Sequence, residues 1–590
     1  MYLKTSLSNG KPYLSFIQGY RQDGKVKQKT IEKLGYLAEL EKLYPDPVAH
    51  FKQVAKERTE KESPQKRLEL DLSSILPDEA DFRKNVGYLA PKSVYSLLRI
   101  RDFLQDKQRQ LKVDFNLNSI FSLLVFNRFL FPSSKKHAFD TKNEYFESFD
   151  FSLPDVYRSL DYFHKYSNEI QQHLHQRICE LVGREKQLGY YDVTNYYFEI
   201  PYEDEDEYDE NGNFLKKGQK KRGPSKEHRK DPIVQMGLLM DSRGIPMAFN
   251  TFSGGESEKN SLLPVVRRVK KDFELERIII VADRGLNTSD NTAFLSGKNH
   301  DDMECQDGYV YGQSILGADR EFKKWVLEQN GYLFDKEKDK DGTPIIFKHK
   351  SRIFAKTIQL KNSKGKRSLS MEIYQKQMVY YSEKYAKKQR KDRERALAKA
   401  KDLISNPGKY SKATSFGAAS YINNIKFLKD TGEIPDGQIL SLNVAKIQQE
   451  ELYDGYYSIV TSEMKLSDSE IRNIYKGLWE IEESFRIIKS EFKARPVYVN
   501  TDEHVEAHFL VCFVALVIMR VLEHMLEKKY TIKQIRNALI RYSCTYLEQN
   551  YYIFDYRDEV LKAIETLFDL DLSKKIMSQG EVKKILQYKK

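Results

Sequence analysis

The order of strand-like and helix-like segments after Gly189 constrains the fold of this chain more than any other feature. The segment YYDVTNYYFEI is rich in aromatic and β-branched residues, which favours a buried β-strand. Two more strand-like segments follow, PIVQMGLLMD and GIPMAFNTFSGG, with the short turn SRG between them. A helix-like segment, EKNSLLPVVRRVKKDF, leads to RIIIVADRGL, whose continuous apolar run is typical of a fully buried strand. We therefore expect three strands in a meander, then a helix, then a further strand.

One aspartate of the first strand and one of the last are candidate site residues. Asp192 lies at the centre of the first strand, and Asp283 follows the apolar run of the last. A buried carboxylate without a partner is costly, so each would need a cation, a metal ion or several hydrogen-bond donors. Alternatively, each aspartate only ends a strand or caps a turn. The order of elements is that of an RNase H-like core, in which carboxylates on neighbouring strands would meet.

A third carboxylate lies on a predicted helix, LSDSEIRNIYKGLWEIEESFRIIKSEFKARPVY. Ser467 and Glu470 form a capping-box pattern at its start. Helical spacing places five apolar residues on one stripe, namely Leu478, Ile481, Phe485, Ile488 and Phe492. We expect that stripe to face the core.

Glu482 lies on a second line of the same helix, together with Tyr475 and Lys489. These residues are spaced by sevens, so they stack within about 40° of each other, and Arg486 falls close to them. One interpretation is a solvated glutamate that pairs with Arg486. The other is a carboxylate that reaches over the sheet edge toward the two aspartates, with cations beside it that could hold phosphates.

At these residues the sequence resembles insertion-sequence transposases of the DDE class, in the branch with a β-strand insertion before the catalytic glutamate. That branch has the helix signature Tyr-x2-Arg-x3-Glu-x6-Lys. Tyr475, Glu482 and Lys489 match it, whereas Leu478 occupies the arginine position. The resemblance therefore leaves the DNA contact of that arginine open in this chain, and Arg486 or Lys476 could make it instead.

Other stretches that resemble the family occur in order between about residues 120 and 530. They are PSSK, VYRSLD, GPSKEHRKD, VADRGL, YDGYYSIVTS and the segment ARPVYV to MRVLE after the glutamate. Each motif is weak by itself, and the ordered set carries the resemblance.

The resemblance implies that Asp192, Asp283 and Glu482 are the catalytic residues and hold two Mg²⁺ ions, for which Mn²⁺ would substitute. Such a pair of ions, about 4 Å apart, activates the attacking oxygen and stabilises the leaving oxygen. Water would cut the transposon end, and the freed 3′-hydroxyl would attack target DNA. DNA contacts are expected from Tyr475, Arg486, Lys489, Lys226, Arg229, Arg284, Lys135 and Lys136.

The spacing of the three acidic residues predicts an inserted domain. Glu482 follows Asp283 much later than one strand and one linker require. Residues 291–445 are therefore expected to form a mostly β insertion between the two parts of the RNase H-like core, 186–290 and 446–530. Its segment KYAKKQRKDRERALAKAK is a basic helix that is either solvated or in contact with DNA. The core itself is expected to hold a mixed five-stranded sheet with helices, within an α/β multidomain chain.

The remaining chain is expected to form DNA-binding and helical regions. Residues 1–60 predict a small β meander, with hairpin turns at SNGK and QDGK, and a helix from Leu37 to Lys56. KERTEKESPQKR resembles a polar linker. Residues 85–185 predict a helical DNA-binding domain, with the core helix NSIFSLLVFNRFLF, the basic turn FPSSKKHAF and a long helix from Asp155 to Val182. Residues 531–590 predict a C-terminal helical region that could support a DNA-bound homodimer.

Composition agrees with a DNA-binding protein of a reducing compartment. The formal net charge is +12, which favours a polyanionic partner, although adenine- and thymine-rich coding would also enrich lysine. The four cysteines form no CxxC pair, which argues against a zinc ribbon or a disulfide scaffold. The N-terminus has no apolar signal region, and FLVCFVALVIM is short for a membrane span and is typical of a buried helix. We expect a cytoplasmic, nucleoid-associated bacterial protein with no membrane partner.

The sequence therefore predicts a DNA transposase that binds terminal inverted repeats and catalyses metal-dependent cleavage and strand transfer. Two alternatives remain open at this point: an RNase H-like nuclease or resolvase that only cuts DNA, and a DNA-binding derivative without catalysis. The basic N-terminal half and the long insertion favour transposition, and the three intact carboxylates argue against lost catalysis.

Overall fold

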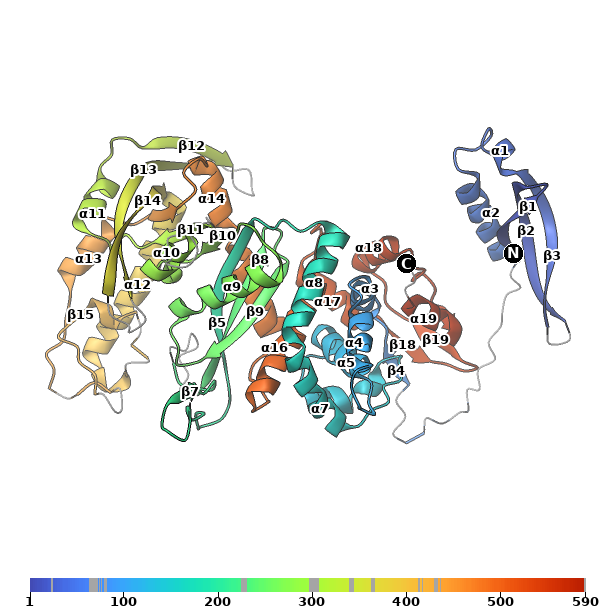
Figure 1. The fold of residues 1–590 in the computed structure, drawn as a ribbon, viewed down its shortest axis with the longest axis horizontal. Helices are drawn as coiled ribbons and strands as arrows, with labels where there is room; N and C mark the ends of the chain where they lie inside the picture. Colours follow the sequence, from blue (N-terminus) through green and yellow to red (C-terminus); the bar gives the residue numbers. More distant parts are fainter. Residues whose placement is uncertain are drawn as a thin grey trace. The chain divides into compact units, whose positions relative to one another are not determined.

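The computed structural model divides into two compact units (Figure 1). The N-terminal unit comprises Met1–Ala80 with Leu547–Asn550, and the main unit comprises Asp81–Tyr546 and Tyr551–Lys590. The structure describes all residues except 23–24, 63–72, 74, 76, 79–81, 224–230, 297–306, 339–343, 362–366, 412–413, 416, 429–432, 436 and 588–590.

The N-terminal unit contains the predicted meander, an antiparallel sheet of β1 (Tyr2–Ser8), β2 (Lys11–Gln22) and β3 (Lys25–Tyr36). Asn9 and Gly10 both have positive φ, 50° and 72°. That is the conformation that a two-residue hairpin turn requires, and it suits Asn-Gly. The meander is thus confirmed. The second turn, at QDGK, lies partly outside the described residues.

The single helix expected from Leu37 to Lys56 is wrong, because the chain forms α1 (Leu37–Leu40) and α2 (Pro47–Glu62). Asp46 starts the second helix, since its carboxylate accepts a hydrogen bond from the Ala49 amide at 2.9 Å. Proline is favoured at the first helical position, which Pro47 occupies. The first part of the predicted linker, up to Glu62, is therefore helical.

The main unit is built around one mixed nine-stranded sheet in the order β12-β13-β14-β17-β11-β10-β5-β8-β9. The strands of its first half are β5 (Leu188–Tyr197), β8 (Ile233–Asp241), β9 (Pro246–Ser253), β10 (Ile279–Ala282) and β11 (Gly308–Gln313). β5, β8 and β9 pair antiparallel as the predicted meander, whereas β10 runs parallel to both β5 and β11. The strand β17 (Tyr456–Thr461) returns beside β11 in the antiparallel sense.

The expected five-stranded sheet is therefore only part of a larger one. The long strands β13 (Pro344–Lys361) and β14 (Arg367–Ser382), with β12 (Leu333–Lys338), extend the same sheet because β14 pairs with β17. This pairing covers an edge of β17 that would otherwise expose unpaired backbone groups. β11, which falls in the range 291–445, pairs with β10 and not with the inserted strands.

Smaller elements of residues 200–455 surround this sheet. They are β6 (Glu207–Tyr208), β7 (Phe214–Lys216), α10 (Ser289–Leu295), α11 (Arg320–Leu327), α12 (Glu383–Ser405), β15 (Ile422–Asn423), β16 (Ser441–Leu442) and α13 (Val444–Glu451). The predicted helix after β9 is α9 (Leu262–Asp272), and Pro264 lies in its first turn. Proline is tolerated there because amides of the first turn have no helical acceptor. Residues Val265, Val266 and Val269 of α9 are buried.

Residues 89–182 are helical, as predicted. They form α3 (Leu89–Leu97), α4 (Ile100–Gln108), α5 (Leu117–Leu130), α6 (Lys135–Asp140), α7 (Leu153–Lys165) and α8 (Ser167–Val182). Two details of the prediction are wrong. FPSSKKHAF contains the helix α6, which Ser134 caps, and the long helix is divided at Tyr166, which leaves helical geometry at φ −98° and ψ 10°.

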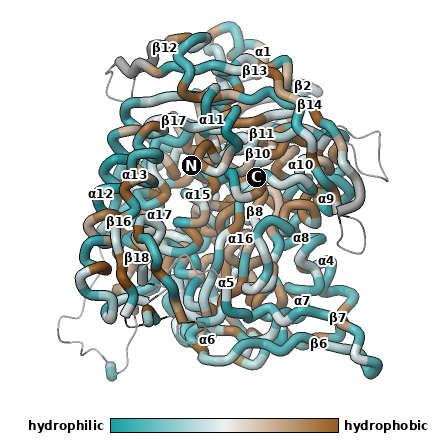
Figure 2. Tube along the Cα trace, turned by 90° about the vertical axis from the view of Figure 1, so that its left-hand side faces the viewer, coloured by the Kyte–Doolittle hydropathy of each residue, from teal (hydrophilic) through white to brown (hydrophobic). Residues whose placement is uncertain are grey.

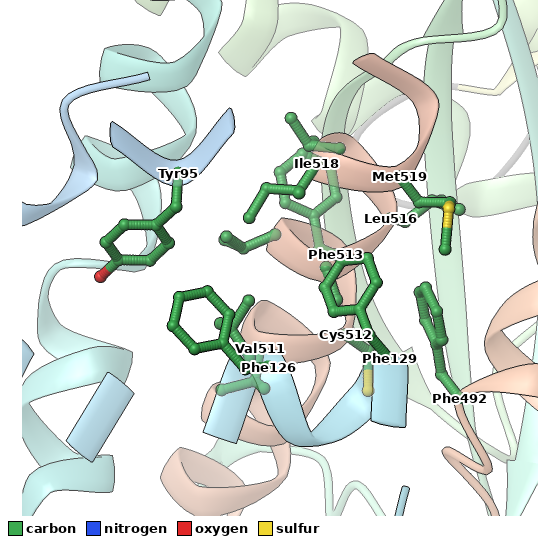
Figure 3. Packing of buried hydrophobic residues seen from close by; sticks show 14 of the residues in the cluster. Tyr95, Phe126, Phe129, Phe492, Val511, Cys512, Phe513, Leu516, Ile518 and Met519 are labelled. Atoms are coloured by element: carbon green, nitrogen blue, oxygen red, sulfur yellow. The ribbon is translucent and has the colours of Figure 1, made fainter. Parts of the chain in front are cut away.

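The core of this region forms around α16 (Asp502–Met525). Phe126 and Phe129 of α5 and Phe492 lie beside Val511 and Phe513 of α16 (Figure 3), and all five side chains are buried. Apolar chain gathers around α16 in the hydropathy view (Figure 2). Among the described residues, α16 alone is long and apolar enough to cross a membrane, and 94% of its most apolar window is buried within the protein. The predicted buried helix is confirmed, although it is longer than FLVCFVALVIM.

The C-terminal region contains helices and a small sheet, not helices alone. Its elements are α17 (Ile532–Arg541), β18 (Ser543–Tyr546), β19 (Tyr551–Phe554), α18 (Glu559–Phe568), β20 (Ile576–Ser578) and α19 (Gln579–Leu586). The strands β20, β19 and β18 join β4 (Arg83–Asn85), which ties this region to the start of the main unit. Val560, Leu561 and Ile564 of α18 are buried in the large core.

Candidate active site

A cavity of about 450 Å³ lies where β5, the end of β10 and the helix after β17 come together. Its lining includes all three predicted acidic residues. The lining residues are Asp192, Thr194, Asp283, Leu478, Ile481, Glu482, Phe485, Arg486, Lys489, Ser490 and Arg495.

Asp192 reaches the cavity because side chains alternate along β5. Tyr191 and Val193 point into the small core under α9, so Asp192 and Thr194 face the other side of the sheet. β5 is paired on both edges, with β10 and β8, which fixes its backbone. The carboxylate is only half-buried. A strand with buried neighbours therefore keeps an acidic residue that opens into a cavity.

Asp283 is brought close by the register of two parallel strands. β10 and β5 pair Val281 with Tyr190, so Asp283 and Asp192 each come two residues further along adjacent strands. Neighbouring strands are about 4.8 Å apart. The Asp283 carboxylate accepts a hydrogen bond from the Gly285 amide at 2.7 Å and begins a short 3₁₀ turn. This bond orients the exposed Asp283 side chain at the carboxyl end of β10.

The helix that carries Glu482 is not continuous. It consists of α14 (Asp468–Lys476), α15 (Trp479–Arg486) and a π-helical turn (Ile487–Glu491). The capping box at Ser467 is confirmed, and the predicted apolar stripe is buried at four of its five positions, all except Leu478. Gly477, between α14 and α15, allows close approach to β5, because a Cβ atom there would lie 2.3 Å from the Tyr190 hydroxyl.

Glu482 differs from its neighbour Glu483 in its surroundings. Glu483 forms ion pairs with Arg520 at 3.0 Å and with Arg486 at 3.1 Å. No cation in the described part of the chain forms an ion pair with Glu482, which is exposed and lines the cavity. The interpretation that Glu482 pairs with Arg486 on a solvated face is therefore wrong.

Cationic side chains surround the acidic ones. Lys489, on the π-helical turn, donates a hydrogen bond to the Thr194 hydroxyl at 2.7 Å and lies 5.3 Å from the centre of the Tyr196 ring. Arg486 and Arg495 also line the cavity. Sequence reasoning missed Arg495, for which the only signal was a cation near the end of the predicted helical segment, directly before Pro496.

Tyr475 lies beside the same carboxylates. Burial raises its pKa to about 12, and the negative charge of Asp283 contributes in the same direction, as does that of Glu482 to a smaller extent. The hydroxyl approaches β11, since a Cβ atom at Gly312 would lie 2.5 Å from it. The phenol therefore stays protonated at neutral pH and can donate a hydrogen bond to an anionic group.

Comparison with known families decides the identity of the chain. The transposase DDE domain family matches residues 200–518, which is more than half of the chain. This chain belongs to the DDE transposase family. The match includes Asp283 and Glu482, while Asp192 precedes its first residue. The N-terminal domain of IS1634 family transposases matches residues 3–70 of this transposase. No curated protein matches the chain.

Family membership makes this protein a DNA transposase, an enzyme that acts on DNA. It agrees with the mixed α/β multidomain fold and with the large mixed sheet. Within the described part of the transposase, no three histidine, cysteine, aspartate or glutamate side chains lie close enough together to form a metal site as they stand.

The other predicted DNA contacts of the transposase fall in different places. Arg284 is exposed directly after Asp283, and Lys136 is exposed on α6. Lys226 and Arg229 lie outside the described residues.

Lys135 is not available to DNA in this structure. It is 3% exposed, and its amino nitrogen lies 2.5 Å from Nδ1 of His508 on α16. Burial lowers the pKa of Lys135 well below its usual range, and the nearby Arg128 lowers it further. The residue belongs to the core that joins α6 to α16.

Proposed function

We propose that the cavity is the active site of an RNase H-like core, in which Asp192, Asp283 and Glu482 hold two Mg²⁺ ions. With it, the transposase would cut DNA at the terminal inverted repeats of its insertion sequence and join the freed ends to target DNA. The observation that carries the proposal is that three carboxylates from three separate elements line one cavity. The meander β5-β8-β9 with β10 and β11 added in parallel supports the RNase H-like assignment.

The donor set fits magnesium by its chemistry. Mg²⁺ prefers carboxylate, water and phosphate oxygens, and Mn²⁺ accepts the same ligands. Neither Asp283 nor Glu482 forms an ion pair with any described cation, so both carboxylates are free to act as ligands. Because the three groups do not converge as they stand, the exposed Glu482 would have to move toward the aspartates. When bound, two such ions would activate the attacking oxygen and stabilise charge on the leaving oxygen.

The other residues of the cavity would bind and orient the DNA backbone. Thr194 holds the Lys489 amino group on the Asp192 face of β5, where it can pair with a phosphate. Arg495 and Arg486, which also line the cavity, add positive charge. The protonated Tyr475 hydroxyl would donate to a phosphate oxygen beside Asp283. The cavity thus combines acidic groups for metal ions with cations for phosphates.

The test is cleavage of a duplex that carries the end of the insertion sequence, with Mg²⁺ or with a chelator. We expect Mg²⁺-dependent nicking at the end, followed by joining of the 3′-end to a supercoiled plasmid. Asp192→Asn and Asp283→Asn should each abolish both steps and leave DNA binding nearly intact, since phosphate contacts supply most of the affinity. Cleavage without joining would favour the nuclease alternative, and binding without cleavage would favour the inactive derivative. Near wild-type cleavage by either variant would remove that residue from the site.

We further propose that the repeats are recognised by residues 1–60 and 85–185. The match of residues 3–70 to a transposase N-terminal domain and the exposed Lys29 and Lys33 on β3 support this. Since α5 and α7 share a core with α16, removing residues 85–185 would expose that core. The sharper test is therefore Lys29→Gln with Lys33→Gln in the full chain. Unchanged footprints over the terminal repeat would argue against recognition by this surface.

A homodimer on paired ends is the third part of the proposal. A transposase must bring two ends together, and one active site per end is the simplest symmetric arrangement. Mass measurement of the protein alone and with end DNA tests this. A complex of one subunit with one end that is fully competent for strand transfer would refute the dimer.

A further inference from the structure

The helix α12 carries a basic face that is separate from the catalytic cavity. The exposed cations on this face are Lys384, Lys387, Lys388, Lys391, Arg395 and Lys399. The exposed Arg390 and Lys401 lie outside this face, and Arg390 pairs with Glu383 and Asp454. At 100° per residue these six side chains fall within about 120° of the helix circumference. They extend along about 22 Å of helix, at 1.5 Å per residue. The face is therefore a continuous positive strip and not a scatter of charges.

The opposite face of α12 attaches the helix to the sheet. Ala386, Ala400 and Leu403 are buried. Arg393 forms two hydrogen bonds with the Asp454 carboxylate, at 2.7 and 2.5 Å, just before β17. Gln389 accepts a hydrogen bond from the Gly455 amide at 2.6 Å. These contacts fix the rotation of α12 and hold the basic face outward.

The pairing of charges differs between the two faces. On the inner face the arginine is neutralised by a nearly buried aspartate. On the outer face, none of the five lysines forms an ion pair with an acidic group in the described part of the chain. Arg395 has only a loose exposed pair with Asp392, at 3.8 Å. A solvated helix stabilised by its own ion pairs would not show this asymmetry.

The first turn of α12 packs beside the sheet that carries the proposed site. The ring of Tyr385 lies 5.8 Å from that of Tyr457 on β17. β17 pairs with β11, which is the neighbour of β10 in the same sheet. The positive strip therefore begins beside the sheet from which Asp192 and Asp283 project.

We propose that the basic face of α12 binds the phosphate backbone of duplex DNA outside the catalytic cavity. The inference rests on the proposed function, because it takes DNA at the cavity as given. Duplex DNA carries one charge per about 1.7 Å of axis with both strands counted, so a length of about 22 Å holds roughly a dozen phosphates, and the strip can reach those on its own side. Such a contact is independent of base sequence and sets affinity and position. Both transposon-end DNA and target DNA offer the same backbone.

The test measures binding of the full chain in chelator, so that cleavage does not enter the result. The probes are a duplex with the transposon end and an unrelated duplex of equal length. The variant replaces Lys384, Lys388, Lys391 and Arg395 with glutamine. A matched control removes the same charge elsewhere on the main unit, at the exposed Lys533, Lys575, Lys583 and Lys584.

Loss of four phosphate contacts should reduce the slope of log affinity against log salt by about 3.6. The ratio of wild-type to variant affinity for DNA should then fall by about 100-fold between 50 and 200 mM salt. The three charge-conserving replacements Lys384→Arg, Lys388→Arg and Lys391→Arg, with Arg395 left in place, should keep the wild-type slope. A change on one probe only supports the proposal and identifies which DNA lies on α12.

An unchanged slope on both probes, or an equal change in the control variant, would overturn the proposal. Since the measurement excludes metal, this outcome is separate from failure of the proposed catalysis. A different result is that the wild-type protein shows no Mg²⁺-dependent cleavage while the α12 variant still has a smaller slope of log affinity against log salt. That result would contradict only the catalytic proposal.

Discussion

Glu482→Gln separates the proposed catalytic role from a structural one, because the structure offers a matched neighbour. Glu482 is exposed and has no ion pair with any described cation. Its replacement should change the free energy of unfolding by no more than about 0.5 kcal/mol. Loss of a metal ligand should remove several kcal/mol of transition-state stabilisation. At 1.36 kcal/mol per tenfold, cleavage should fall by about 10³-fold or more.

Glu483→Gln should show the opposite pattern. The Arg520 side chain is only 3% exposed and pairs with Glu483 at 3.0 Å. Without that carboxylate, Arg520 keeps Glu523 at 2.8 Å but loses one charged partner in a buried setting. The expected cost is about 1–3 kcal/mol of unfolding free energy. Cleavage by the folded variant should stay within a few-fold of wild type.

Chemical denaturation measures the free energy of unfolding of each variant, and Mg²⁺-dependent nicking of transposon-end duplex measures its cleavage rate. Both variants remove one negative charge from the same helix, so a general effect of charge on DNA binding would appear in both. The reasoning is refuted if Glu482→Gln cleaves within tenfold of wild type. It is equally refuted if the variant loses cleavage only because it unfolds.

Two further predictions concern the stability of the main unit. Arg393→Ala should cost about 3 kcal/mol in denaturant unfolding, because it leaves the nearly buried Asp454 only a longer ion pair with Arg390, at 3.7 Å. Arg395→Ala should cost under about 0.5 kcal/mol. A small loss for Arg393→Ala would show that this pair does not hold α12. Burial lowers the pKa of His175 in the folded protein to about 3. The unfolded chain, in which the pKa is about 6.5, therefore binds the proton more readily. The free energy of unfolding should fall as the pH drops from about 6.5 toward 3. The His175 ring stacks on Phe273, so His175→Phe keeps a ring in that place and should remove this part of the pH dependence. Parallel curves of unfolding free energy against pH for wild type and variant would contradict this.

Local signals account for the parts of the fold that the sequence predicted. The hairpin at Asn9 and Gly10 depends on two residues that accept positive φ. The capping box at Ser467 depends on one side chain three residues from another. The order of strands around Asp192 follows from runs of apolar residues bounded by turns. Each of these features is decided within a few residues, so the sequence contains it directly.

Predictions from the sequence are wrong where contacts between distant segments determine the structure. β14 pairs with β17 and so merges the insertion with the core sheet, and strand pairing of this kind has no local signature. Lys135 resembled a surface cation in a basic turn, but Ser134 starts a helix there and His508 covers the amino group. The division at Tyr166 likewise interrupts a helical pattern without proline or glycine.

The candidate site illustrates both cases in one segment. WEIEESFR contains three glutamates, and only the spacing of Glu482 from Tyr475 and Lys489 distinguished it in the sequence. The structure adds an independent reason, because Glu480 pairs with Lys528 at 3.0 Å and Glu483 pairs with Arg520 at the same distance. An acidic residue that other cations neutralise is a poor ligand for a further one. Glu482, which lines the cavity with no such partner among the described residues, is therefore the carboxylate of α15 best suited to a metal ion.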